Sequence, residues 1–115
     1  MDRRQTGTLA ENSAAAFLES QGFTILARNF LRRIGELDVV ARDGDLLVVA
    51  EVRTRASERF GGAAASIGPG KQRRIAATSA LFLQQRPELR RCRVRFDVIV
   101  IRDGEIEWIK HAFEI

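Results

Sequence analysis

The pattern of apolar and polar positions predicts two helices and five strands. Over residues 7–21 apolar side chains recur every three or four positions, and Gly22 follows where a helix often ends. The same spacing returns over residues 71–85 and stops before Pro87. The predicted strands are 23–31, 36–42, 46–53, 94–101 and 106–111, each rich in Val, Ile, Leu or Phe. The order αβββαββ predicts an α/β fold of the α+β mixed-sheet type, with helices flanking a central mixed sheet.

Two Asp-Gly pairs predict the hairpin turns between these strands. Asp43-Gly44 separates the second and third strands, and Asp103-Gly104 separates the last two. A tight two-residue turn needs positive φ, which glycine and aspartate tolerate. Residues 54–70, by contrast, contain four glycines and a proline without clear periodicity. A connection of this length often has a functional role.

Composition narrows the class of protein. A chain of 115 residues that is 45% hydrophobic can bury one core, so we expect a single domain over residues 1–115. No segment approaches the roughly 18 consecutive apolar residues of a membrane span, and the first residues do not lead into a signal-peptide apolar region. A single cysteine, Cys92, forms no internal disulfide and fits a reducing compartment. We therefore expect a cytoplasmic protein that does not contact a membrane.

The charge favours an anionic partner. The formal net charge is +4, and arginine supplies all but two of the nineteen basic residues. Arginine binds phosphate through planar, bidentate hydrogen bonds, which suits a surface that follows a nucleic acid backbone. A general drift from lysine to arginine codons would give the same composition. Charge alone leaves both explanations open, because it describes attraction and not chemistry.

Acidic side chains gather at one end of the second and third predicted strands. With the loop at residues 43–44, Glu36 faces Glu51, and Asp38 is the diagonal neighbour of Glu51, roughly 7 to 8 Å away at the backbone. Alternation places these acids and Arg53 on one face of the hairpin. The other face is wholly apolar and predicts a surface buried against a helix; its members are Leu37, Val39, Ala41, Leu46, Val48, Ala50 and Val52.

Two carboxylates that lean toward one point require a cation or a proton between them. Mg²⁺, or Mn²⁺ in its place, is commonly held by one or two carboxylates together with waters and phosphate oxygens. Asp38 and Glu51 are the candidate metal ligands. Glu11, at the border of the buried face of the first helix, is either a third acid that reaches this point or a solvated residue near the helix N-terminus. The spacing leaves both alternatives for Glu11 open.

These fragments resemble a known family. Gly-Glu-Leu-Asp at 35–38, a short turn and Val-Ala-Glu-Val-Arg at 49–53 resemble the PD-(D/E)xK nuclease motif. The chain more closely resembles the YraN family of small bacterial proteins. The fragments that carry this second resemblance, in order along almost the whole chain, are 7–11, 28–29, 35–38, 51–55, Lys71 and 95–97.

The resemblance implies a restriction-endonuclease-like core with Asp38 and Glu51 as metal ligands and Glu11 as an accessory acid. In such sites the metal activates a water for attack on phosphorus and stabilises the leaving oxygen. The motif lysine is replaced here by Arg53, which supplies charge but cannot act as a base, because a guanidinium group keeps its proton in proteins. Lys71, on the buried face of the second helix in its first turn, is an alternative source of a titratable cation.

Two functions that involve nucleic acid follow as expectations, and a third alternative is a nuclease-like fold that serves protein assembly. The first is a metal-dependent endonuclease that hydrolyses phosphodiester bonds in DNA, including branched or damaged DNA, with catalytic residues Glu11, Asp38, Glu51 and Arg53. The second is a noncatalytic nucleic-acid-binding module with a degenerate nuclease site. In both, the expected nucleic-acid contacts are Arg55, Lys71, Arg73 and Arg74, around the long loop and the start of the second helix. A homodimer is compatible with either function.

Overall fold

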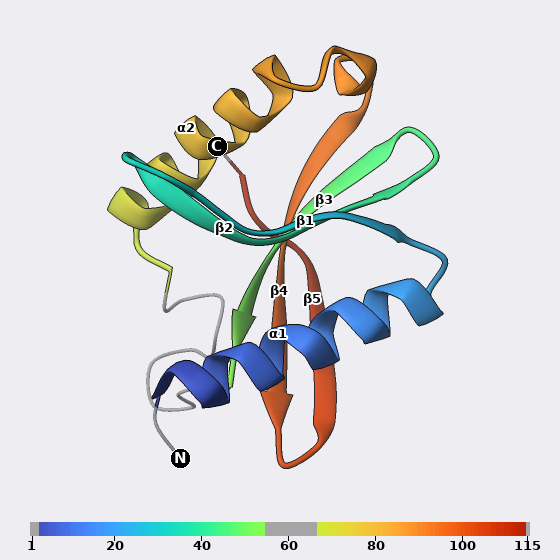
Figure 1. The fold of residues 1–115 in the computed structure, drawn as a ribbon, viewed down its shortest axis with the longest axis vertical. Coiled ribbons are helices and arrows are strands. Elements are labelled where there is room, and N and C mark those ends of the chain that lie inside the picture. The colour runs from blue at the N-terminus through green and yellow to red at the C-terminus, as the bar shows by residue number, and fades with distance from the viewer. Residues whose placement is uncertain (1–2, 55–66, 115) are drawn as a thin grey trace.

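The computed structural model describes the backbone of residues 3–54 and 67–114, and the side chains from Thr8 onward within these ranges. The elements are α1 (Arg3–Ser20), β1 (Thr24–Arg32), β2 (Gly35–Asp43), β3 (Leu46–Arg53), α2 (Pro69–Gln84), the short 3₁₀ helix η3 (Pro87–Leu89), β4 (Arg93–Arg102) and β5 (Glu105–Phe113) (Figure 1). The predicted order αβββαββ is confirmed, and η3 is the one addition among the described residues. Neither helix in the described part of the chain is both long and apolar enough to cross a membrane.

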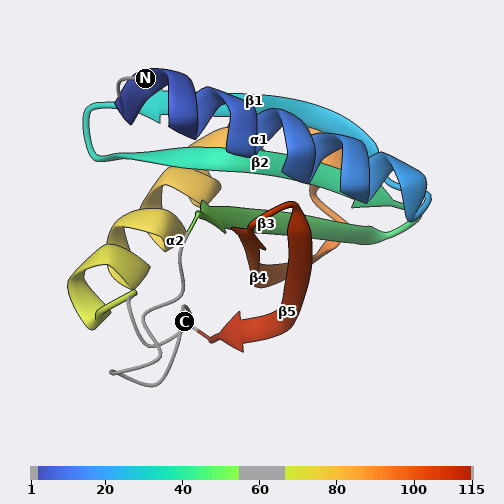
Figure 2. The same ribbon diagram turned by 90° about the horizontal axis from the view of Figure 1, so that it is seen from below.

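The strands form one mixed sheet in the order β1-β2-β3-β4-β5. Each neighbouring pair is antiparallel except β3 and β4, which are parallel and are joined through α2. A parallel pair needs a long crossover connection, and the helix supplies it. Figure 2 shows how strongly the sheet twists from β1 to β5. The expected mixed α/β class is therefore confirmed.

The two helices cover opposite faces of the sheet (Figure 1), and each face has its own core. The α1-side core contains Ala14, Leu18, Phe23, Val39, Ala41, Val48, Ala50 and Ile99. The α2-side core contains Leu37, Val40, Leu47, Val49, Ile67, Ile75, Phe82, Leu89, Val98, Val100 and Phe113. Each large aliphatic side chain that is fully buried contributes about 1.5 to 3 kcal/mol to the stability of the fold. The central strands are therefore fixed from both sides, which makes them a rigid support for polar groups at their ends.

Helix α1 ends as the sequence predicts. Gly22 has φ +94°, and the N–H groups of Gly22 and Phe23 donate to the carbonyl oxygens of Glu19 and Leu18. This pair of hydrogen bonds is the Schellman arrangement, in which the left-handed residue is usually glycine. The cap returns the chain sharply, so that β1 begins beside the last turn of α1.

The hairpin between β2 and β3 differs from its prediction. Asp43 pairs with Leu46, so the loop residues are Gly44 and Asp45 and not Asp43 and Gly44. The reason is that Gly44, with φ +60°, takes the first central position of the turn, where a type II′ turn places glycine. At the second hairpin, Asp103 and Gly104 both have positive φ and form the loop as predicted.

The observed register changes which acid lies opposite Glu51. Val39 pairs with Ala50, the last pair of the β2–β3 ladder, and one further step sets Asp38 opposite Glu51. The sequence had predicted a diagonal relation between Asp38 and Glu51, with Glu36 opposite Glu51; both were wrong. Since the register shifted by an even number, the strand faces are otherwise kept.

A kink in β1 and β2 causes one further departure. Leu37 belongs to the α2-side core, whereas the strict alternation of β2 had placed it with Val39 in the α1-side core. The neighbouring strand changes face in the same way, because Arg28 contacts α1 and Phe30 contacts Phe82 of α2. The intervening residue of β1 is Asn29, which has φ +53°. The kink therefore lies where Asn29 and Asp38 stand on adjacent strands.

Candidate metal-binding acidic site

The candidate site lies where β2 separates from β3. β3 remains paired with β4 through Arg53, but its ladder with β2 stops at Ala50. Beyond that point a side chain of β2 replaces its backbone as the partner of β3, because Asp38 Oδ2 accepts a hydrogen bond of 2.9 Å from the Val52 N–H. A carboxylate therefore replaces the missing strand partner, which fixes Asp38 at the opening between the two strands.

Glu51 is the most deeply buried acid of the site. Its side chain is 1% exposed, and its Oε2 atom has no hydrogen-bond partner among the residues that the structure describes. Burial raises the pKa of Glu51 to about 7, and the charge of Asp38 raises it as well, while Lys71, Arg53 and the Asp38 backbone act in the opposite direction. Burial also raises the pKa of Asp38. A buried carboxylate oxygen without a partner is costly, so the pair requires a proton or a cation.

Two cations approach the acids from different elements. Arg53 Nη1 lies 4.0 Å from Asp38 Oδ2, and Lys71 Nζ lies 3.8 Å from Glu51 Oε1. The side chain of Lys71 is 42% exposed, so its ammonium group reaches the site from the solvent side. Lys71 therefore reaches the acids from the first turn of α2. Both separations are long for direct hydrogen bonds, which leaves the acids underpartnered.

The acids line a cavity of about 120 Å³ together with Gly35, Glu36, Lys71, Arg74 and Ile75. This space is large enough for several waters, since one water needs roughly 10 to 15 Å³ by the same kind of measure. Gly35 makes the close approach of β2 to α2 possible, because a Cβ atom at this position would lie 2.7 Å from Thr78 Oγ1. The convergence of Asp38 and Glu51 on one space, which the hairpin pattern predicted, is confirmed by this shared lining.

Glu11 approaches the site from α1. Burial raises the pKa of Glu11, a hydrogen bond with the Asn29 side chain lowers it, and the charges of Asp38 and Glu36 raise it. Of the two alternatives for Glu11, the structure favours the one in which it neighbours the acids of β2. Arg28 adds a second tie to this helix, by donating a hydrogen bond to Asn12 Oδ1.

Asn29 is the site residue that sequence reasoning did not single out. It has positive φ inside a strand, and its side chain holds Glu11. Asparagine tolerates the left-handed region better than most residues do, and it is otherwise rare within strands. A polar Arg28-Asn29 pair in the middle of an apolar strand was the signal for this position.

Three of the four basic residues predicted to bind nucleic acid lie at the start of α2. Arg73 and Arg74 are exposed in the first two turns of α2, on the same element as Lys71. No acidic residue occupies the first turn of α2. Cations at a helix N-terminus oppose the helix dipole, and a bound anion would offset this cost. Arg55, the fourth predicted contact, lies outside the described residues.

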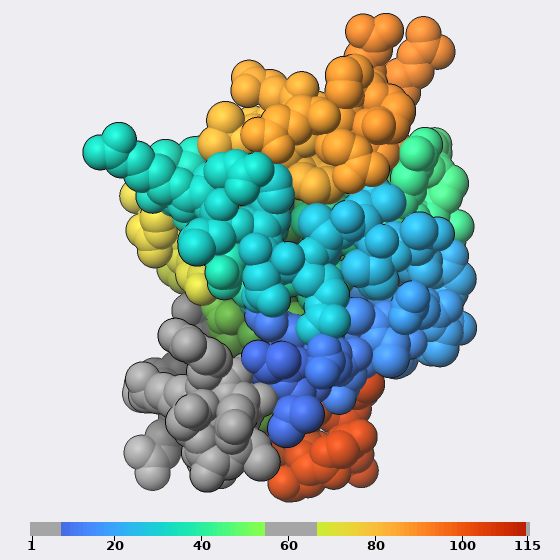
Figure 3. All heavy atoms as spheres, viewed as in Figure 1, coloured from blue at the N-terminus to red at the C-terminus, as the bar shows by residue number. Residues whose placement is uncertain are grey.

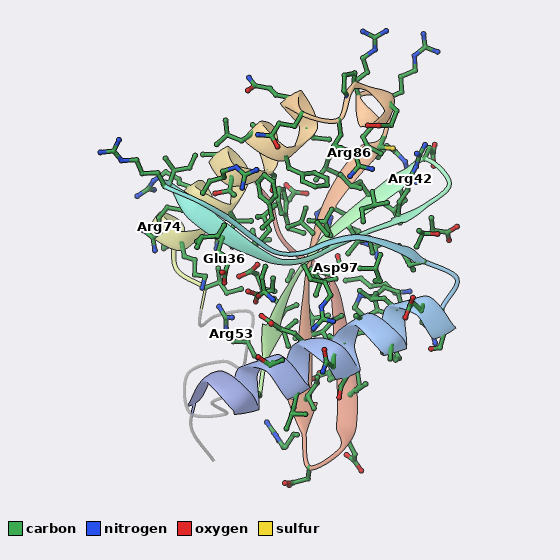
Figure 4. The ribbon with its side chains drawn as sticks, in the orientation of Figure 1. Glu36, Arg42, Arg53, Arg74, Arg86 and Asp97 are labelled. Atoms are coloured by element: carbon green, nitrogen blue, oxygen red, sulfur yellow. The ribbon has the colours of Figure 1, made fainter. Side chains whose placement is uncertain are left out.

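The labelled side chains in Figure 4 separate two parts of the molecule. Glu36, Arg53 and Arg74 lie toward the end at which both α1 and α2 begin, whereas Asp97 lies near the centre of the sheet. Asp97 is fully buried and pairs with Arg95, and it also accepts hydrogen bonds from Trp108 Nε1 and from the His111 backbone. Asp97 is therefore a satisfied structural acid.

The acidic pair fits a hard divalent cation that keeps part of its water shell. No group of three or more His, Cys, Asp or Glu side chains that could hold a metal occurs in the described ranges. Mg²⁺, however, is often bound by only one or two carboxylates, with waters and substrate oxygens completing its shell. The unpartnered Oε2 of Glu51 and the cavity beside Asp38 supply such a two-carboxylate site.

Sequence comparisons give the family to which this chain belongs. The model of UPF0102, an uncharacterised protein family, matches residues 10–101. A UPF0102 protein of Bordetella avium is 46% identical over 112 residues, covering 97% of this chain and 77% of that protein. A UPF0102 protein of Dechloromonas aromatica is 47% identical over 107 residues, covering 93% and 87%. The chain belongs to the UPF0102 family.

Proposed function

We propose that this protein is a metal-dependent endonuclease that hydrolyses phosphodiester bonds in DNA. The observation that carries the proposal is the pair of acids, Asp38 and Glu51, that line one cavity with an unpartnered Glu51 oxygen and two cations beside them. The resemblance of this segment to the PD-(D/E)xK motif and to the YraN family points in the same direction.

Asp38 and Glu51 would hold Mg²⁺ or Mn²⁺, which supplies an activated water and stabilises charge on the phosphate oxygens. The protein itself contributes positioning. Val52 N–H fixes Asp38, and Glu11, which is hydrogen-bonded with the Asn29 side chain, adds a further acid on α1 whose charge interacts with that of Asp38. Since the acids lie in a mostly buried setting, their interactions with charge are stronger than they would be in water.

The two neighbouring cations suit different tasks. Arg53 stabilises negative charge that develops on phosphorus oxygens and cannot transfer a proton. Lys71 carries an ammonium group, which unlike a guanidinium group can transfer a proton, and its Nζ atom lies 3.8 Å from Glu51 Oε1. We assign the proton-transfer role that the motif lysine has in similar sites to Lys71, and the electrostatic role to Arg53.

The test is metal-dependent cleavage. Linear, single-stranded and four-way-junction DNA are incubated with the wild type and with Asp38→Asn, Lys71→Gln and Arg53→Lys, in Mg²⁺ or Mn²⁺. Asp38→Asn keeps an oxygen that accepts from Val52, so it removes the charge with little change of shape. Cleavage by the wild type that is lost in Asp38→Asn supports the proposal. Absence of products from every substrate with either metal would overturn it.

The second candidate function is a noncatalytic nucleic-acid-binding module. It is favoured by one observation, which is that arginine, a residue that cannot act as a base, occupies the motif position beside Asp38. This function predicts salt-sensitive DNA binding without cleavage, since binding would rest on phosphate contacts. Restoration of cleavage by Arg53→Lys, in a protein otherwise inactive, would identify a degenerate site.

A further inference from the structure

Beside the acidic site, the hairpin between β1 and β2 carries exposed apolar side chains. The exposed large hydrophobic residues of the described ranges are Leu31 (64%), Leu9 (53%) and Ile34 (42%). Two of them, Leu31 and Ile34, stand at the tip of this one hairpin, where Arg32 pairs with Gly35. Single exposed hydrophobics are common on proteins, but two at one projecting turn are not explained by chance scatter.

The hairpin projects from the body of the molecule and is held in place. Figure 3 shows its cyan atoms extending beyond the rest of the surface, beside the start of α2. Arg32, in the last pair before the tip, lies with its guanidinium 3.9 Å from the centre of the Phe30 ring and donates a hydrogen bond to Gln85 Oε1, at the C-cap of α2. The ring of Phe30 packs edge-on against Phe82. The tip is therefore presented on a rigid support.

The hairpin is continuous with the acidic cavity. Ile34 immediately precedes Gly35 and Glu36, which line that cavity. Arg33, at the same tip, and Arg73 and Arg74 on α2 are exposed and basic. Leu31 and Ile34 are therefore close in sequence to an exposed arginine and to two residues that line the acidic cavity, which Arg74 of α2 lines as well. A nucleic acid, which combines negatively charged phosphates with the apolar faces of its bases, matches this surface.

We infer that Leu31 and Ile34 form a wedge that contacts bases where the stack of a DNA duplex is interrupted by a nick, a flap or a branch point. Apolar side chains inserted between base steps open or kink a duplex, at the cost of the stacking that they disrupt. That cost falls where stacking is already broken, so the wedge favours discontinuous DNA over intact duplex. The inference rests on the proposed function, because it names the substrate class of the same site.

The experiment measures base unstacking and not cleavage. DNA with 2-aminopurine at a nick, flap or four-way junction is titrated with the wild type in Ca²⁺, beside an intact duplex of the same sequence. We expect a rise of 2-aminopurine fluorescence at the discontinuity and binding at least tenfold tighter than to intact duplex. The double variant Leu31→Ser/Ile34→Ser should lose both effects, while its affinity for intact duplex stays within about twofold.

Controls separate the wedge from other roles. Leu9→Ser removes the third exposed hydrophobic and should leave both readouts unchanged, and thermal unfolding should show that both sets of variants remain folded. The inference is overturned if the double variant keeps the preference, if the wild type binds no DNA, or if sedimentation shows that Leu31 and Ile34 instead join two copies of the chain. A wild type that unstacks bases but never cuts would refute only the nuclease proposal. One that cuts without unstacking would refute only the wedge.

Discussion

Asp97 and Glu51 are both buried acids on adjacent strands of one sheet, yet their surroundings differ completely. Asp97 is 0% exposed and accepts hydrogen bonds from Arg95, Trp108 and the His111 backbone. Glu51 is 1% exposed, has one oxygen without a partner, and lies 3.8 Å from its closest cation. Burial alone therefore does not identify a functional acid. Asp97 has all its hydrogen-bond partners within the fold, whereas Glu51 keeps an oxygen that a ligand could still bind.

The largest effect should come from breaking the satisfied acid. Asp97→Ala leaves the Arg95 guanidinium and the Trp108 N–H without their acceptor, so we expect a loss of about 3 to 5 kcal/mol in the free energy of unfolding. The comparison variant is Asp38→Ala, which leaves one backbone N–H unpaired and should cost about 1 to 3 kcal/mol. Urea denaturation of both variants measures the two losses in the free energy of unfolding. Equal losses would remove the distinction between the two acids.

Removing the charge of Glu51, in contrast, should stabilise the protein at high pH. The pKa of Glu51 is about 7 in the folded chain, above its ordinary value of 4.5, so the folded state holds this proton more tightly than the unfolded state. The stabilisation from the neutral acid is complete below about pH 4.5 and is lost as the pH rises through about 7.

Glu51→Gln, which cannot ionise, should therefore gain stability relative to the wild type as the pH rises from about 5 to 8, by on the order of 2 kcal/mol without added metal. Urea denaturation at the two pH values measures the difference, with Glu105→Gln on the exposed turn of β5 as the control. A stability difference that does not change with pH would show that Glu51 is ionised at no cost.

The cavity beside Glu51 depends on the absence of a side chain at Gly35. Gly35→Ala places a Cβ atom 2.7 Å from Thr78 Oγ1. We expect a loss of about 1 to 2 kcal/mol from this overpacking, with partial recovery in Gly35→Ala/Thr78→Ala. Gly68→Ala is the matched control, because nothing lies within 4 Å of a Cβ atom at Gly68. Failure of Thr78→Ala to restore stability would place the strain elsewhere.

The smallest effects should come from single surface cations. Arg73→Gln and Arg74→Gln should each weaken DNA binding a few-fold and lower the dependence of log affinity on log salt concentration by about one. Arg90→Gln removes the same charge from the residue that follows η3, beyond the far end of α2, and is the control. If all three substitutions act alike, binding follows net charge and not the start of α2.

The sequence predicted most of the fold because local signals agree with it. Gly22, Pro87 and the Asp103-Gly104 turn each have one favourable backbone conformation, and the structure uses it. It failed where a choice depended on a neighbouring element. Asp43-Gly44 and Gly44-Asp45 are both acceptable turns, and the kink at Asn29 is visible only once β1 and β2 are paired.

The candidate site was predicted in part for the same reason. Alternation along a hairpin was enough to bring Asp38 and Glu51 together, and an even error in register did not separate them. The approach of Lys71 and Glu11 depends on how two helices pack on opposite faces, which periodicity does not specify. The roles of these residues in binding and catalysis stay predictions.

The central claim is that Asp38 and Glu51 together hold a divalent cation. Calorimetric titration of Mn²⁺ into the wild type at about pH 8, repeated near pH 6, tests it directly, beside Asp38→Asn, Glu51→Gln and the control Asp45→Asn. We predict binding by the wild type and the control that weakens as the pH falls, with proton release, because the cation displaces the proton of Glu51. Undiminished Mn²⁺ binding by Asp38→Asn and Glu51→Gln would contradict the claim.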